Sequence, residues 1–98
     1  MVIFISFNFF QNPETRNEIL SLCKSENVEQ LKKILLTRLE FGTAGIRGSM
    51  GPGYSQMNDL VIIQTAQGLT VYLEENLKDI IYTQGVVVGY DGRYNSRR

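Results

Sequence analysis

The chain has 98 residues, with ten basic and ten acidic side chains, no histidine and one cysteine, so its formal net charge is zero. This length fits at most one small domain, and the balanced charge argues against a nucleic-acid binder or a protein held on an anionic membrane. Without histidine, the chain cannot contain a Ser-His or Cys-His nucleophile pair or a histidine-based zinc site.

Residues 1–10 are uncharged and rich in Ile, Val and Phe, but they lack the basic start and the small-residue cleavage site of a signal peptide. We interpret them as a short edge strand or as a non-native start. No apolar run reaches the length of about 18 residues that a transmembrane helix needs. Lone Cys23 cannot form an internal disulfide, which is compatible with a reducing compartment, and we expect a cytoplasmic protein.

Two helices are predicted next, over residues 11–40. Asn12 is followed by proline and then glutamate, and these three start signals predict a helix over 13–24. Asn27, with a glutamine three residues later, resembles a capping box. Leucines at helical spacing continue this second helix to Leu39. The two helices predict a helical hairpin that carries no catalytic signal.

A third helix and two strands are predicted after residue 43. Asn58, or the aspartate after it, is a good N-cap, and apolar residues at helical spacing carry the helix to Tyr82. Residues 86–90 are a β-branched run closed by Asp-Gly, which is typical of a buried parallel strand. With residues 44–48 as the first strand, these elements form a βαβ unit. Gly68, inside the helix, costs about 1 kcal/mol, which we expect close packing against a strand to offset.

Residues 41–53 hold five of the nine glycines. Neither a P-loop nor a dinucleotide-binding loop fits, because the segment has no lysine and its glycines do not have the required spacing. The groups that could still bind an anion are the exposed backbone N–H groups, the hydroxyls of Thr43 and Ser49, and Arg47. The guanidinium of Arg47 presents a fork of donors that matches a phosphate. On these residues alone, phosphate binding and a purely structural turn both stay open.

Two further patterns have a functional and a structural interpretation. Residues 45–48 match the bare GxxG loop of KH domains, but the zero net charge and the lack of two flanking helices argue against a nucleic-acid partner. Asp91 and Arg93 follow the last predicted strand, at the sheet edge where open α/β folds place ligands. They could equally form a local ion pair in a turn.

The sequence RLEFGTAGIRG at residues 38–48 resembles the amino-terminal signature of the α-D-phosphohexomutases. The similarity continues in three segments, namely MGPG at 50–53, MNDL at 57–60 and GVVVGYDGR at 85–93. It covers residues 12–98 and is strongest to the phosphoglucomutase and phosphopentomutase branch. The resemblance implies an α/β fold in which the helical hairpin is followed by an incomplete βαβ unit, with residues 41–98 forming part of a mixed α/β/α sandwich, domain I of the family.

The resemblance also implies an activity. Phosphohexomutases are isomerases of carbohydrate metabolism that move phosphate between two positions of a hexose or pentose phosphate. They use a phosphoserine, Mg²⁺ and a bisphosphate intermediate such as glucose 1,6-bisphosphate. By this resemblance, Arg47 matches the family arginine beside the phosphoserine, and Thr43 lies on the same loop, so both are expected to bind the substrate or its phosphate. We expect four further residues at the edge of the site: Gly45, Ser49, Asp91 and Arg93.

The phosphoserine loop of this family, of the T-A-S-H-N-P type, does not occur in the sequence, and neither does its D-G-D-x-D-R metal loop. We therefore expect a fragment or truncated form with no catalytic or metal residue of its own, inactive alone and binding neither Mg²⁺ nor the bisphosphate tightly. Two alternatives stay open. One is a non-catalytic module that binds sugar phosphates. The other is a module that docks on the full-length enzyme through an exposed sheet edge at 86–90.

Overall fold

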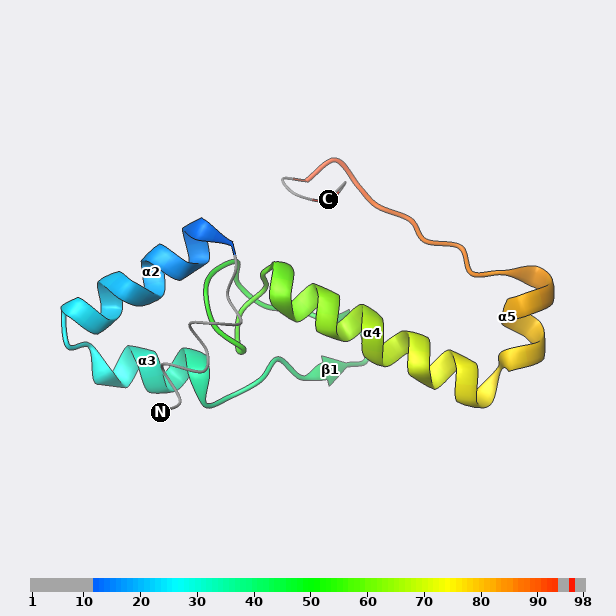
Figure 1. Cartoon of the computed structure of the whole chain (residues 1–98), viewed down its shortest axis with the longest axis horizontal. Coiled ribbons are helices and arrows are strands. Elements are labelled where there is room, and N and C mark those ends of the chain that lie inside the picture. The colour runs from blue at the N-terminus through cyan, green and yellow to red at the C-terminus, as the bar shows by residue number, and fades with distance from the viewer. Residues whose placement is uncertain (1–11, 94–95, 97–98) are drawn as a thin grey trace. The chain divides into compact units, whose positions relative to one another are not determined.

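The computed structural model describes residues 12–93 and Ser96, so the predicted edge strand at 1–10 lies outside the described residues. The elements are α2 (Pro13–Lys24), α3 (Val28–Leu35), β1 (Phe41–Gly42), β2 (Gly45–Ile46), α4 (Asp59–Asn76) and α5 (Lys78–Gln84) (Figure 1). The chain divides into two compact units, residues 1–66 and 67–98, and α4 passes from the first into the second. Within the described ranges, no helix is long and apolar enough to cross a membrane.

Helix α2 has the bounds that the sequence predicts. The side-chain oxygen of Asn12 accepts a hydrogen bond from the backbone N–H of Glu14 at 2.9 Å, and proline takes the first helical position, where no N–H is needed. At the start of α3, the side chain of Asn27 accepts from the N–H of Gln30 at 3.2 Å. The predicted caps of both helices are therefore confirmed.

The prediction that the second helix reaches Leu39 is wrong, because α3 ends at Leu35. Its last carbonyls are taken by a loop that lies far along the sequence. The backbone N–H of Tyr54 donates to the carbonyl of Ile34 at 2.7 Å, and the Ser55 hydroxyl donates to the carbonyl of Lys33 at 3.0 Å. These bonds occupy the acceptors that a longer helix would have used for its own N–H groups.

The core lies between α2 and α3, which fold back on each other as a helical hairpin (Figure 1). Four aliphatic side chains form its buried cluster: Ile19, Leu31, Ile34 and Leu35. Tyr54 and Leu60 pack against this cluster from the loop after β2 and from the start of α4. Each fully buried side chain of this kind contributes about 1.5–3 kcal/mol. The predicted amino-terminal hairpin thus anchors the loops that follow it.

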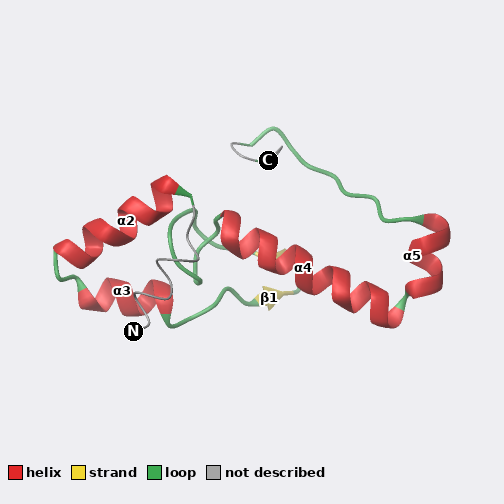
Figure 2. Cartoon of the chain, in the orientation of Figure 1, coloured by secondary structure: helices red, strands yellow, loops and turns green. Residues whose placement is uncertain are grey.

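The strands β1 and β2 form an antiparallel pair in which Phe41 lies opposite Ile46 and Gly42 opposite Gly45. Figure 2 marks β1 as a short yellow arrow. Together with the helices, the two strands confirm the α/β class. Strand β2 lies within the predicted strand at 44–48, but its neighbour is β1 rather than a parallel strand. A two-residue connection favours such tight antiparallel pairing. Gly45 has φ of +92°, a conformation that glycine adopts without the steric cost of a Cβ atom.

The third predicted helix is divided into α4 and α5. Its predicted start is confirmed, because the side-chain oxygen of Asn58 accepts from the N–H of Val61 at 3.1 Å. Leu77 then leaves helical geometry with φ −133° and ψ 28°, and the amide of Asn76 donates to the carbonyl of Tyr72. Asparagine favours such a break because its side chain competes for backbone acceptors. A Cβ atom at Gly68 would meet no described atom within 4 Å, so the expected packing against a strand is wrong.

Residues 86–90 were predicted as a strand and are not one in the structure. They run from the end of α5 as an extended segment (Figure 1). A single extended segment gains no ladder hydrogen bonds until a second strand lies beside it, so β-branched composition alone does not make a strand. The predicted parallel pairing of the βαβ unit is therefore corrected to the short antiparallel pair described above.

Candidate functional site

The residues predicted to contact phosphate lie together on and beside the β1–β2 pair. Thr43 is in the two-residue connection, Gly45 is in β2, and Arg47 follows β2 directly. The side chains of Thr43 and Arg47 are exposed. Among the described residues, no hydrogen bond or ion pair occupies the Arg47 guanidinium. A solvated guanidinium without a protein acceptor retains its donors for an incoming anion.

The loop after Arg47 is held by Asn58, a buried residue just before α4. Its side-chain amide donates to the carbonyls of Gly51 at 2.9 Å and Gly53 at 2.7 Å, while its oxygen caps α4. The carbonyl of Ser49 accepts from the N–H of Met57 at 2.8 Å. Ser49, a predicted edge residue, thus lies at the start of a loop that is closed by backbone and side-chain bonds.

Arg38 fixes the segment that leads into β1. Its Nη1 donates to Oε1 of Gln64 on α4 at 3.2 Å, and its guanidinium carbon lies 5.1 Å from the centre of the Tyr54 ring. A cation at this distance over an aromatic face is attracted by the ring electrons. Sequence reasoning placed Arg38 in the signature but assigned it no role. Its contacts hold the segment before β1 against α4 and against the loop after β2.

The other two predicted edge residues lie in the second unit, in a turn. The Arg93 Nε donates to Oδ2 of Asp91 at 2.7 Å, and the Ser96 hydroxyl donates to Oδ1 at 2.5 Å. The structure therefore contains the local ion pair that was the structural alternative for Asp91 and Arg93. It brings Thr43, Gly45, Arg47 and Ser49 into one segment and places Asp91 with Arg93 in a separate one.

The pKa of Asp91 is lowered from its ordinary value of 3.8, chiefly by the hydrogen bond from Ser96 and then by the backbone N–H of Arg93. A lowered pKa means that the turn is stabilised above about pH 3.8 and that this stabilisation is lost as pH falls through the lowered value. In a carboxyl NMR titration, we expect Ser96→Ala to move the Asp91 midpoint upward. The matched change Ser25→Ala should leave it in place, and equal midpoints in all three proteins would contradict the assignment.

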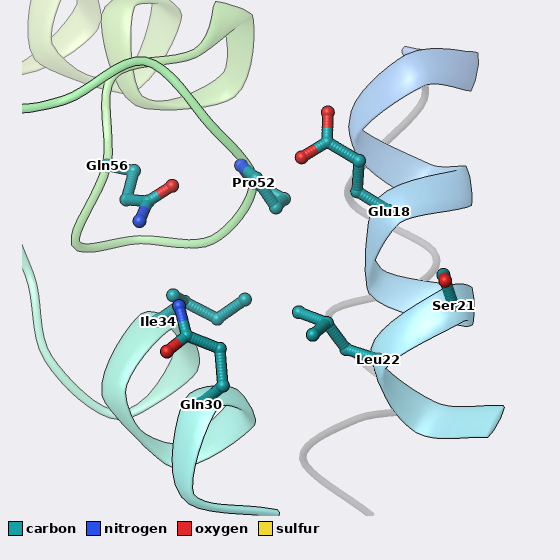
Figure 3. A pocket seen from close by; sticks show the side chains of 7 residues that line it. All are labelled: Glu18, Ser21, Leu22, Gln30, Ile34, Pro52 and Gln56. Atoms are coloured by element: carbon teal, nitrogen blue, oxygen red, sulfur yellow. The ribbon is translucent and has the colours of Figure 1, made fainter. Parts of the chain in front are cut away.

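A groove of about 330 Å³ lies between α2, α3 and the loop before α4 (Figure 3). Seven residues line it: Glu18, Ser21, Leu22, Gln30, Ile34, Pro52 and Gln56. None of these residues was predicted as a site residue. Helical spacing places the first five on two helix faces, but only the tertiary arrangement brings the loop beside them. Among the described residues that line the groove, none is a cation, so they do not offer a phosphate the charge that Arg47 offers.

Comparison with known proteins identifies the family. Residues 38–98, more than half of the chain, match the family described as phosphoglucomutase/phosphomannomutase, alpha/beta/alpha domain I. The chain belongs to this family. The match begins at Arg38, the residue that holds the segment before β1 in place. It contains every residue that was predicted to contact phosphate or to lie at the edge of the site. The resemblance noted in the sequence is thereby confirmed.

Similar full-length proteins carry phosphomutase and synthase names. The chain is 48% identical over 83 residues to a phosphopentomutase of Mus musculus, covering 85% of this chain and 13% of that protein. It is 41% identical over 87 residues to a phosphoribomutase of Saccharomyces cerevisiae, covering 89% of this chain and 14% of that protein. A glucose 1,6-bisphosphate synthase of Mus musculus is 42% identical over 83 residues, with 85% and 13% covered. No solved structure gives a significant match.

Proposed function

We propose that Thr43 and Arg47, on and beside the β1–β2 pair, belong to the substrate-phosphate loop of a phosphomutase. This phosphomutase would act on hexose or pentose phosphates through a bisphosphate. The observation that carries the proposal is the family match over residues 38–98 around an exposed Arg47 that no described acceptor occupies. The single free cysteine, Cys23, supports a place in the cytoplasm. The chain spans 13–15% of the length of the curated relatives it matches, so the activity of the whole protein stays a proposal.

The side chains on and beside the β1–β2 pair support a phosphate ligand. Arg47 presents a planar fork of N–H donors that can hold two phosphate oxygens together, and Thr43 adds a hydroxyl from the adjacent connection. A cation beside a transferring phosphoryl group also stabilises the charge that spreads over its oxygens in the transition state. In this proposal, Thr43 and Arg47 bind and orient the phosphate of the sugar.

The proposed role does not include turnover by these 98 residues alone. The sequence has no histidine and no T-A-S-H-N-P loop, so it carries no candidate for the phosphoserine of the family. Within the described ranges, no group of three or more His, Cys, Asp or Glu side chains could hold a metal ion. The chain is proposed to bind sugar phosphates without transferring the phosphoryl group.

Titration calorimetry of the full chain with glucose 1,6-bisphosphate tests the binding role. We expect Arg47→Gln to weaken binding by about tenfold or more, because a hydrogen bond to a charged group contributes about 1.5–3 kcal/mol. The matched change Arg16→Gln, at an exposed position of α2 outside the candidate site, removes the same charge and should leave binding intact. Equal heats for the chain and the Arg47 variant would remove the proposed phosphate contact.

A coupled assay tests the absence of turnover. The full chain is incubated with glucose 1-phosphate or ribose 1-phosphate, Mg²⁺ and glucose 1,6-bisphosphate, and we expect a rate equal to that of the reaction without protein. The physical reason is that positioning one phosphate does not supply the nucleophile that would carry the phosphoryl group between the bisphosphate and the sugar phosphate. Robust formation of the 6-phosphate or 5-phosphate product would show that the chain holds a nucleophile that the sequence does not reveal.

A further inference from the structure

The side chain of Asn58 makes two kinds of hydrogen bond, and only one of them concerns a helix. Its oxygen caps α4 by accepting from the N–H of Val61. Its nitrogen donates to three loop carbonyls, those of Gly51, Gly53 and Gln56, at 2.9, 2.7 and 3.3 Å. A helix cap needs only the oxygen, which serine or aspartate also provides. The amide nitrogen, in a residue that is 8% exposed, therefore serves the loop and not the helix.

The loop that Asn58 closes, residues 49–57, begins two residues after Arg47. Met57 lies beside the first residues of this 49–57 loop. Its N–H donates to the carbonyl of Ser49 at 2.8 Å, and its carbonyl accepts from the N–H of Gly51 at 3.1 Å. These bonds join residues close together in sequence, so the loop is closed by its own atoms and by Asn58. The backbone that leaves Arg47 is thereby fixed against the start of α4.

The segment before β1 is held by the same loop. The N–H of Leu39 donates to the carbonyl of Tyr54, inside the 49–57 loop, at 3.1 Å. A Cβ atom built at Gly48 would lie 2.5 Å from Cδ2 of Leu39, so this side chain lies close against the residue that follows Arg47. The chain that enters the β1–β2 pair and the chain that leaves it are therefore both in contact with a structure that Asn58 closes.

We propose that Asn58 is a positioning residue for phosphate binding, because it closes the 49–57 loop and the closed loop fixes the backbone that carries Arg47. This inference rests on the proposed function, which assigns the phosphate to Arg47. Its physical basis is that a guanidinium holds two phosphate oxygens in a narrow range of orientations. A backbone that is ordered beforehand loses less conformational entropy when the ligand binds. Without the amide of Asn58, binding has to order the loop as well.

A double-mutant cycle tests whether Asn58 acts through Arg47, with titration calorimetry of the full chain and glucose 1,6-bisphosphate. We expect Asn58→Ser, which keeps an oxygen for the cap of α4, to weaken binding about fivefold. In the Arg47→Gln background, the same change should weaken binding by less than about twofold, because the guanidinium that the loop positions is already gone. Equal losses in the two backgrounds would mean that Asn58 does not act through Arg47 and would overturn the proposal.

Two controls separate positioning from general stability. Asn27→Ala removes the side-chain cap of α3 and should leave binding of the bisphosphate unchanged. Sucrose favours the compact state, so it keeps a destabilised Asn58→Ser chain folded, and far-UV circular dichroism checks that it does. We expect the folded variant to bind about fivefold more weakly in sucrose as well. If sucrose restored the binding of the unchanged chain, Asn58 would contribute to stability alone and the proposal would fail.

Hydrogen exchange followed by NMR, which needs no ligand, distinguishes failure of this proposal from failure of the proposed function. In Asn58→Ser, we expect the N–H groups of Gly51 and Met57 to exchange about tenfold faster or more, because the loop opens locally. The N–H groups inside α2 and α3 should change less. If the unchanged chain bound no bisphosphate, the proposed function would fail, and exchange would still show whether Asn58 holds the backbone after Arg47. Equal exchange at Gly51 and Met57 in the two proteins would overturn the proposal even if the bisphosphate binds.

Discussion

Replacing Gly53 with valine is expected to lower the free energy of unfolding of the first unit by about 2–5 kcal/mol. Gly53 has φ of +98°, where a side chain is strained, and a Cβ atom built there would lie 2.7 Å from the Cβ of Ile34 and against its carbonyl. Ile34 is 1% exposed in the core and cannot move aside. Urea unfolding followed by circular dichroism measures the loss.

A matched glycine in α4 provides the control. Gly68 has helical neighbours on both sides, and a Cβ atom there would meet nothing described within 4 Å. Gly68→Ala should therefore increase helix stability by about 1 kcal/mol, because alanine loses less backbone entropy in a helix. A Gly53 variant as stable as the unchanged chain would show that the loop does not pack against the end of α3.

Replacing Asn58 with alanine is expected to lower the free energy of unfolding by about 2–4 kcal/mol. The change removes the side-chain cap of α4, which contributes about 1 kcal/mol, and leaves buried loop carbonyls without donors, at about 1–3 kcal/mol. The three carbonyls belong to the loop after β2, at Gly51, Gly53 and Gln56. Thermal unfolding of the variant, compared at one pH with the unchanged chain, measures the total effect.

Asn58→Ser separates the two contributions. Serine caps a helix about as well as asparagine, but it has no amide to donate to the loop. We expect it to recover about 1 kcal/mol of the loss in the alanine variant, with the remainder assigned to the loop bonds. If the serine variant matched the unchanged chain, the amide of Asn58 would contribute nothing to the loop that follows Arg47.

Local signals explain which parts of the fold the sequence could predict. The start of α2 follows from Asn12 and the proline after it, and the start of α4 follows from Asn58, because each cap acts on N–H groups within three residues. The end of α3 could not be predicted in this way. It is set by Tyr54 and Ser55, which lie about twenty residues further along the chain and donate to the last carbonyls of the helix.

The candidate site also has features that local sequence patterns predict and features that depend on distant residues. Glycine spacing and Arg47 left a phosphate-binding loop and a structural turn both open, and the structure places Thr43 in the connection of a tight antiparallel pair and Arg47 directly after it. Residues 86–90 have strand composition, but a strand depends on a neighbour that no local pattern supplies. The groove was missed for a similar reason, since its lining comes from two helices and a loop that meet only in the folded chain.

Helix α4 leaves the packed core part-way along its length. Val61 is buried in its first turn, whereas Leu69, Val71 and Tyr72 are all more than half exposed. A helix that packs against little is marginal in water, so most of its order in this region has to come from a covering surface. If a surface covers these side chains, ordering of the exposed part of α4 and binding to that surface are one coupled event, and the affinity is reduced by the entropy of ordering.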